Sequence, residues 1–244
     1  MKLLLEEVGV KSPVPELARD SLKLSEAAGV SFGQGAMVVQ VNHDGKNYAF
    51  KWFAKFHGES ADQLLARARS IKNEEEYYFD AGLTEEQVPK NNFFIGEGVL
   101  GDPELFSLQT WCDGTMLKNV RLRNIIGNRE LRLSLANLFN RCSSIYEDHG
   151  VFPDLISGDK VTVLGKKIPD PRKIVWPFWT SNIMICDDVA VLCDTESQDP
   201  RQGSFTEKLI LLHRELTIFT AKLLTLDVDR PKEKVSLKDN THSL

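Results

Sequence analysis

The residues of this chain with the clearest chemical potential are Asn182 and Asp194, at the two ends of one hairpin-like segment. Two short apolar stretches lie between them, separated by the acidic pair Asp187-Asp188, as expected for two strands joined by a tight turn. Such a hairpin brings the carboxamide and the carboxylate to the same end of a small sheet. Both offer oxygen ligands to Mg²⁺, the ion of phosphoryl-transfer sites. An ordinary surface hairpin has the same pattern, so the interpretation depends on residues upstream.

Lys51 is the second candidate, because it lies within the apolar stretch 48–53. In a strand it shares a face with apolar neighbours, and an unpaired ammonium is costly to bury there. The acidic run 74–76 in the next predicted helix offers partners. Glu74 lies beside the apolar face of that helix and is the preferred partner, with Glu75 second. The alternative for the run as a whole is a solvated acidic face.

Two glycines and a further aspartate complete the set of candidates. Gly33 and Gly35 lie between two predicted strands, where a backbone without side chains can approach phosphate oxygens closely. Hairpin turns also use glycine, so this pair alone is a weak signal. Asp154 follows a helix and a proline, at a corner where a carboxylate can orient a hydroxyl group or accept its proton. The same pattern is typical of a plain turn.

Apolar periodicity and capping residues predict the elements that must position these side chains. A capping box of Ser60 and Gln63 begins a helix that Gly82 ends, and Asn128 begins a second helix that Gly150 ends. The composition then changes from strand-rich to helix-rich near residue 114. Strands are expected at residues 30–41, 48–53, 88–100 and 105–111, with hairpins at 160–167 and 182–194.

The last predicted helix begins at a capping box of Ser204 and Glu207. Its large apolar residues recur at helical spacing, so we expect them to face the core. They are Leu209, Leu212, Leu216, Phe219 and Leu223. Residues 230–244 are polar and are expected to form a frayed tail.

Composition restricts the class of protein. The chain has 244 residues, of which 42% are hydrophobic and 27% charged, as in ordinary globular proteins. Its net charge of −5 argues against nucleic-acid binding through bulk positive charge. No apolar run approaches the roughly 20 residues that span a bilayer, and the first apolar run is too short for a signal peptide. The cysteines lack metal-ligand spacing and indicate buried free thiols in a reducing compartment, which predicts a cytoplasmic protein. They are Cys112, Cys142, Cys186 and Cys193.

In chain order, the glycine loop, strand lysine, helix glutamate, connecting segment, aspartate and Asn–Asp hairpin resemble the protein-kinase-like fold. The chain looks most like its small bacterial and aminoglycoside-phosphotransferase-like members, over roughly residues 30–226. The strongest pieces are residues 49–51, the hinge-like Asp113-Gly114 and the hairpin 182–194. The resemblance implies one α+β domain over 1–244 with two lobes. The lobe with an antiparallel sheet would span about 1–112 and the short, mostly helical lobe about 113–229.

The resemblance also implies ATP and Mg²⁺ as cofactors and a role for each candidate residue. Lys51, paired with Glu74, would contact the α- and β-phosphates, and Asp154 would be the catalytic aspartate. Asn182 and Asp194 would hold magnesium. The remaining nucleotide contacts would come from Gly33 and Gly35 over the phosphates and from the backbone of Gln109, Trp111 and Cys112 at the adenine.

The chain departs from the family pattern in several places. Val38 replaces the third loop glycine, and no His-Arg or His-Gly precedes Asp154. Asn182 follows 28 residues after Asp154 instead of about five, so residues 156–180 are interpreted as an insertion. Asp159 is the competing catalytic candidate. The Asp-Phe-Gly motif is present only as Asp194-Thr195-Glu196.

Three functions therefore stay open. The first is an ATP- and magnesium-dependent phosphotransferase acting on a hydroxyl of an unidentified small-molecule or protein acceptor. The second is a pseudokinase that serves as a nucleotide-binding or interaction module, which the insertion and the missing histidine motif favour. The third is an interaction domain that binds no nucleotide. Within the insertion, the aromatic stretch 176–179 is either a lid over the site or a cluster that packs the insertion onto the second lobe.

Overall fold

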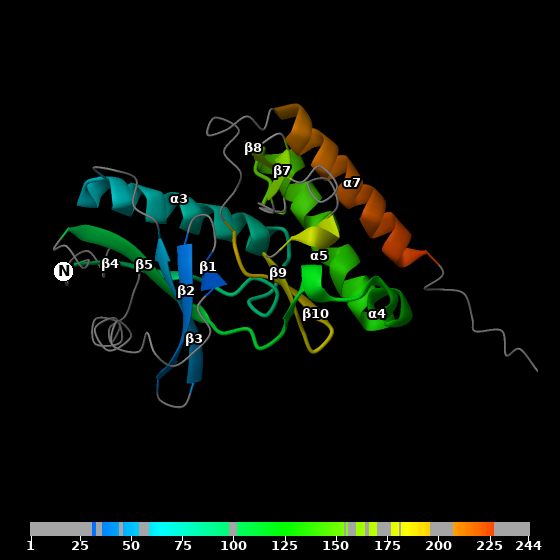
Figure 1. Cartoon of the computed structure of the whole chain (residues 1–244), viewed down its shortest axis with the longest axis horizontal. Helices are drawn as coiled ribbons and strands as arrows, with labels where there is room; N and C mark the ends of the chain where they lie inside the picture. The colour runs from blue at the N-terminus through cyan, green and yellow to red at the C-terminus, as the bar shows by residue number, and fades with distance from the viewer. Residues whose placement is uncertain are drawn as a thin grey trace, which may run out of the picture.

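The computed structural model describes most of the chain from the first predicted strand to the last predicted helix. The described residues are 31–32, 36–43, 46–53, 59–97, 102–153, 155, 160–163, 166–169, 177–180, 182–195 and 207–226. Over these ranges the protein is an α+β structure with antiparallel sheets and several helices. Figure 1 shows the longest strands on one side of the molecule and α4, α5 and α7 on the other. No helix in these ranges is both long enough and apolar enough to cross a membrane.

The first sheet has five antiparallel strands in the order β1-β2-β3-β5-β4. Its strands are β1 (Ser31–Phe32), β2 (Ala36–His43), β3 (Lys46–Phe53), β4 (Asn92–Glu97) and β5 (Pro103–Thr110). The register places Lys51 of β3 opposite Val38 of β2 and Ser107 of β5. Lys51 therefore lies in the central strand, with a hydrogen-bonded neighbour on each side.

Helix α3 (Ala61–Asp80) covers one face of this sheet. The predicted capping box is confirmed: the Ser60 hydroxyl accepts the Gln63 N–H at 3.3 Å, and the Gln63 side chain accepts the Ser60 N–H at 2.8 Å. Leu64 and Ile71 of α3 bury their side chains against Phe53 and other apolar residues of the sheet. The opposite face carries a separate hydrophobic cluster of three aromatic residues and one leucine, which are Phe50, Phe94, Phe106 and Leu108.

In the part of the second half that the structure describes, there are two smaller sheets and three α-helices. Strand β6 (Thr115–Met116) pairs with β9 (Ile183–Cys186), which pairs with β10 (Val189–Leu192). A separate hairpin joins β7 (Lys160–Val163) to β8 (Lys166–Pro169), close to the predicted bounds. The helices are α4 (Leu122–Gly127), α5 (Arg129–His149) and α7 (Glu207–Thr225), with 3₁₀ turns at Leu117–Asn119 (η1) and Pro177–Trp179 (η2).

Helix α5 is the centre of the second core, and its predicted ends are confirmed. The Asn128 side chain accepts the Leu131 N–H at 3.2 Å, and Gly150 ends the helix at φ 70. Glycine suits this left-handed position because it has no Cβ. The α5 residues Leu135, Leu138, Phe139 and Cys142 are fully buried, and the end of α3 joins the same core through Tyr78.

The prediction of which face of α7 (Glu207–Thr225) packs on the core is wrong. The helix packs against α5 through a different face, made of Ile210, His213, Thr217, Thr220, Ala221 and Leu224. The Thr217 and Thr220 hydroxyls donate to carbonyl oxygens one turn earlier, those of His213 and Leu216, at 2.8 and 2.7 Å. Because these small side chains satisfy their own hydroxyls, they can be buried. The larger residues Leu212, Phe219 and Leu223 are left exposed.

Candidate functional site

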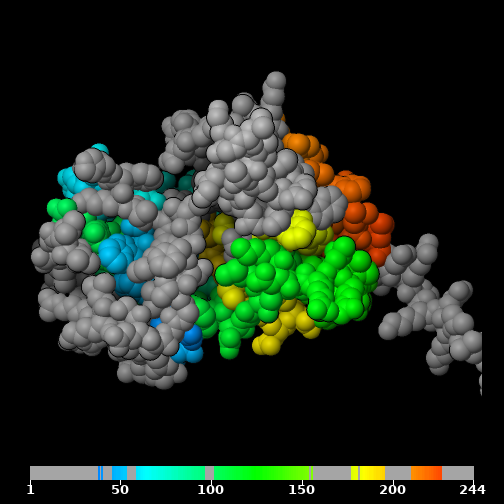
Figure 2. Space-filling model, in the orientation of Figure 1, coloured from blue at the N-terminus to red at the C-terminus, as the bar shows by residue number. Residues whose placement is uncertain are grey.

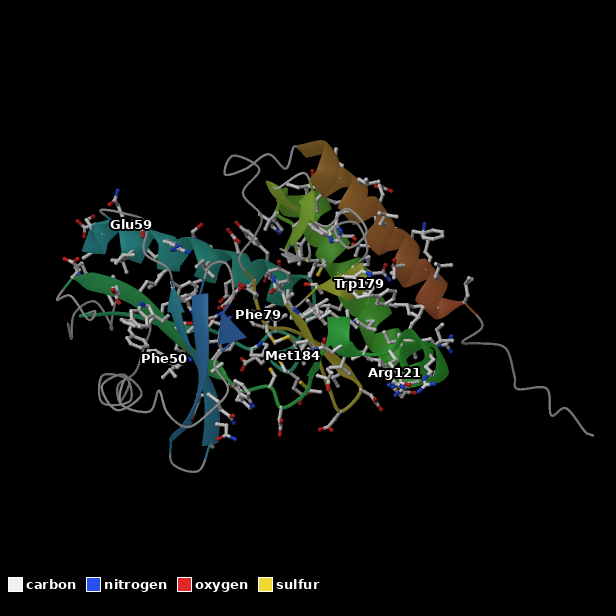
Figure 3. All side chains as sticks on the ribbon, in the orientation of Figure 1. Phe50, Glu59, Phe79, Arg121, Trp179 and Met184 are labelled. Carbon is white, nitrogen blue, oxygen red and sulfur yellow. The ribbon has the colours of Figure 1, made fainter. Side chains whose placement is uncertain are left out.

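The Lys51 side chain links the two halves of the chain. It is buried on β3, and its Nζ donates a hydrogen bond to the carbonyl oxygen of Cys193 at 2.6 Å. Cys193 directly follows β10 and precedes Asp194. Figure 3 labels Phe50 on β3 and Met184 on β9, one on each of the two sheets that this contact connects. A buried ammonium needs such an oxygen partner, because burial without one is costly.

The acidic run on α3 divides into three different environments. Glu75 is fully buried, Glu74 is half-buried and Glu76 is exposed. Oε1 of Glu75 accepts hydrogen bonds from both the backbone N–H and the side-chain amide of Asn91. Burial raises the pKa of the Glu75 carboxyl, although the Asn91 hydrogen bonds and the charges of two lysines act in the opposite direction.

The Glu75 network continues under the central strands. The Ser107 hydroxyl donates to the Asn91 side-chain oxygen at 3.0 Å, and Ser107 lies opposite Lys51 in the sheet. One of the two lysine charges acting on Glu75 is that of Lys51. Glu75 is therefore tied to Asn91 inside the interface between α3 and the sheet. The sequence did not reveal this role, since Asn91 carries no motif and reaches Glu75 only through tertiary packing.

Glu74 and the hairpin residue Asp194 act on the same buried phenol, that of Tyr78. The charges of Glu74 and Asp194 both raise the pKa of the buried Tyr78 phenol, in addition to the larger effects of burial and of Cys142. Tyr78 is one helical turn after Glu74 on α3. Glu74, the glutamate preferred from the sequence, and Asp194 therefore both lie within electrostatic range of Tyr78.

The predicted hairpin between Asn182 and Asp194 is confirmed. Its turn residues Asp187 and Asp188 have φ values of 47 and 67, the left-handed conformation of the tight turns that join antiparallel strands. Beyond the last paired residues, the Cys193 N–H donates to the Asn182 carbonyl at 2.8 Å. Asn182 and Asp194 are therefore at the same end of the hairpin, and the Lys51–Cys193 contact places the first sheet at that end.

The segment after β5 is anchored on both sides. The buried Gln109 side chain donates to the Pro89 carbonyl, and the Trp111 N–H donates to the Asn47 carbonyl at 3.2 Å. Any ligand at this segment would therefore have to use other backbone groups, such as those of Cys112. Gly114 lies so close to β9 that a Cβ would be 2.3 Å from the Ile185 carbonyl oxygen.

Three of the four free cysteines gather beside this segment. The thiols of Cys193 and Cys186 both act on the pKa of the Cys112 thiol, and all three residues are half-buried. The expectation of buried thiols holds for Cys142 alone, whose pKa burial raises to about 12. Cys112 comes from the link after β5 and the other two from the ends of the hairpin strands, so only the tertiary fold brings them together.

The pKa of the Cys112 thiol is lowered, most strongly by its interaction with the Cys193 thiol. The Cys186 thiol and the charge of Lys51 lower it further, and burial acts in the opposite direction. The pKa of Cys186 rises to about 11, mainly through burial, and that of Cys193 rises mainly through its interaction with the Cys112 thiol. Cys112 is thus the most acidic thiol of the group. Among the described residues, no three His, Cys, Asp or Glu side chains form a metal-binding group.

The predicted aromatic segment packs on the second core. Phe178 makes an edge contact with Phe139 of α5, at 6.3 Å between ring centroids, and Pro177 is buried. This agrees with the packing interpretation for the described part of this stretch. The candidates Gly33, Gly35, Asp154 and Asp159 lie outside the described residues.

Comparison with known proteins does not assign the chain to a family. No protein-family model matches the chain, and no curated protein matches it.

Proposed function

We propose that this protein has a kinase-like fold that binds ATP with magnesium and transfers a phosphoryl group to a hydroxyl of a small-molecule or protein acceptor. The observation that carries the proposal is the contact between Lys51 and the Cys193 carbonyl, next to Asp194. It brings a buried cation to the carboxylate and carboxamide end of the hairpin. Phosphate oxygens and a divalent cation require this combination of charges.

The elements that hold these residues support the proposal. A five-stranded antiparallel sheet carries Lys51 in its centre, α3 brings Glu74 and Glu75, and the link after β5 leads to the helical half. This is the order of parts in the resemblance to the protein-kinase-like fold. The proposed nucleotide would lie between the first sheet and the hairpin, with its adenine at the backbone of Cys112.

The chain's own groups suit this chemistry. An ammonium has three donors, so Lys51 can keep the Cys193 carbonyl and still donate to phosphate oxygens. The Asn182 and Asp194 oxygens are hard ligands, and a site with one carboxylate fits Mg²⁺, which binds through one or two carboxylates and substrate phosphates. When bound, magnesium would neutralise charge on the phosphates. The proposed role of Asp154 is to orient the acceptor hydroxyl and accept its proton.

A pseudokinase is the second candidate, and the segment after Asp194 favours it. Thr195, at the position where the family has a phenylalanine, is fully buried. The long separation of Asp154 from Asn182 points the same way. Such a protein would keep nucleotide binding and lack transfer.

Nucleotide binding is tested by thermal shift with ATP, in the presence and absence of magnesium. We expect ATP with magnesium to raise the melting temperature of the wild type and to have no such effect on Lys51→Met. Lys46→Met is the matched control, because Lys46 is an exposed lysine of the same strand, and it should keep the wild-type shift. Absence of a shift in the wild type, or an equal shift in Lys51→Met, contradicts binding at this site.

Turnover separates the two candidates. If the protein is a phosphotransferase, Asp194→Ala abolishes ATP turnover and Asp154→Ala reduces it strongly. Binding without turnover in the wild type supports the pseudokinase instead. Turnover that neither substitution changes refutes these residue assignments.

A further inference from the structure

Helix α7 carries an apolar stripe that lies on the surface. The exposed fractions are 48% for Leu212, 51% for Phe219 and 42% for Leu223, and 58% for Leu226, which directly follows the helix. In Figure 2 the orange and red atoms of α7 are visible at the upper right of the molecule. Large apolar side chains that line up on one exposed face mark interaction sites more often than single exposed leucines do.

The spacing of the stripe follows a coiled-coil seam. Its residues alternate at intervals of three and four, in the order Leu212, Leu216, Phe219, Leu223 and Leu226, of which Leu216 is half-buried and the others are exposed. This is the a and d pattern of a heptad repeat, with Leu216 and Leu223 at a positions. A helix that only packs on its own core does not need this second apolar face.

The stripe is separate from the face that holds α7 on the protein. That face contains Ile210, Thr217 and Leu224, and it packs against α5. Arg214 of α7 adds an ion pair with Glu147 of α5. Since α7 is already attached through these residues, the stripe is available to a second helix.

We infer that α7 pairs in antiparallel orientation with α7 of a second copy of this chain. In an antiparallel pair of helices, the residues at heptad position a lie opposite those at heptad position d. When Leu216 lies opposite Phe219 of the second copy, Leu212 lies opposite Leu223. One register therefore pairs these four residues of the stripe.

The charges beside the stripe favour the same register. Glu215 and Lys222 occupy g positions and are exposed. In the antiparallel pair, Glu215 lies opposite Lys222 of the second copy, and the symmetry of the dimer repeats this contact. A parallel pair would instead place Glu215 opposite Thr220, which is buried against α5. Glu215 forms an ion pair with the neighbouring Arg214. The Glu215 side chain is still 64% exposed, so its carboxylate stays accessible to a second copy.

The expected interface is modest in size. A helix of 19 residues is about 28 Å long, and paired helices lie about 8–10 Å apart. Such a two-helix contact is at the low end of specific interfaces, so we expect a dissociation constant on the order of micromolar. The inference rests on α7 alone and does not depend on the proposed function.

Sedimentation equilibrium of the full chain, from about 1 to 200 µM, tests the dimer in the range where a micromolar equilibrium is visible. We expect a reversible monomer–dimer equilibrium in the wild type and a dissociation constant at least about 100-fold higher in Phe219→Glu, which would bury a charge in the seam. Ile126→Glu is the control, because Ile126 on α4 is 58% exposed and off the stripe. It should dimerise as the wild type does. A wild type that stays monomeric, or a dimer that Phe219→Glu leaves intact, overturns the inference.

A charge exchange tests the orientation. Glu215→Lys or Lys222→Glu alone places like charges opposite each other and should raise the dissociation constant about tenfold. The double variant Glu215→Lys with Lys222→Glu restores opposite charges and should return the constant to near the wild-type value. If the double variant is no better than the single ones, the antiparallel register is wrong. Circular dichroism of every variant confirms that the helices stay folded.

Discussion

The Lys51 ammonium donates to the carbonyl oxygen of Cys193, 142 positions away in the chain, at 2.6 Å. This hydrogen bond joins the central strand of the first sheet to the end of the second hairpin. It therefore places a buried cation beside Asp194 without requiring any ligand. A hydrogen bond from a charged donor stabilises by about 1.5–3 kcal/mol, enough to hold a site in place.

The first prediction concerns Glu75. Burial raises its pKa above the ordinary value of 4.5, so the native carboxyl binds its proton more tightly than the unfolded one. Stability should therefore fall as pH rises from 4.5 through the raised pKa and then level off. Glu75→Gln keeps an acceptor oxygen for Asn91 and should remove this part of the pH dependence. Thermal unfolding between pH 4.5 and 8 measures it.

Two controls accompany Glu75→Gln. Glu76→Gln makes the same change on the exposed neighbour and should leave the pH profile as in the wild type. Glu75→Ala leaves the buried Asn91 donors without their acceptor and should cost about 1–3 kcal/mol. Identical pH profiles for the wild type and Glu75→Gln would show that Glu75 does not titrate as argued.

The second prediction concerns thiol reactivity. The thiolate is the nucleophile, so iodoacetamide at pH 7.5 should alkylate Cys112 first and Cys142 last. Cys193→Ala removes the largest influence that lowers the Cys112 pKa and should slow its alkylation. Cys186→Ala removes a smaller effect and should slow it less. Peptide mass spectrometry measures each rate, and equal rates at Cys112 and Cys142 would contradict the assigned environments.

Sequence patterns predicted the elements whose signals are local. The Ser60–Gln63 capping box and the caps of α5 involve residues within a few positions of each other, and the Asp187-Asp188 turn is a dipeptide signal. Such signals depend little on the rest of the fold. They were sufficient to predict that Asn182 and Asp194 share one end of a hairpin.

Tertiary contacts account for what the sequence could not show. Periodicity on α7 identifies an apolar stripe, but it cannot distinguish a core face from an interaction face, and the small residues around Thr217 turned out to face α5. Glu75 is fully buried because Asn91 supplies two donors from a loop. Cys112 comes from the link after β5, whereas Cys186 and Cys193 come from the hairpin of β9 and β10. In each case the deciding partner is distant in sequence and carries no motif.

The third prediction tests the start of α5. The Asn128 side chain accepts the Leu131 N–H, and its amide donates to the Asp188 carboxylate at 2.7 Å, which ties the helix to the hairpin turn. Asn128→Ala removes both bonds and should lower the free energy of unfolding by about 1–2 kcal/mol. Asn128→Asp keeps the cap but loses the donor and should be intermediate. Asn124→Ala, at an exposed position of α4, is the control and should change stability little.

The fourth prediction tests the close approach of Gly114 to β9. A Cβ at this position would lie 2.3 Å from the Ile185 carbonyl oxygen and 2.6 Å from the Cys186 Sγ. The carbonyl belongs to a paired strand and cannot move without disturbing the pairing of β6 with β9. Gly114→Ala should therefore lower the free energy of unfolding by about 1–3 kcal/mol, as overpacking does elsewhere.

Gly127→Ala is the matched control for Gly114→Ala. A Cβ at Gly127 meets no atom within 4 Å, and the residue lies in α4, where alanine is favoured over glycine by about 0.5–1 kcal/mol. This variant should be as stable as the wild type or slightly more stable. Urea denaturation compares the two substitutions directly. Equal midpoints for Gly114→Ala and the wild type would mean that β6 can shift away from β9 at no cost, and that the thiol group beside it is not held rigidly.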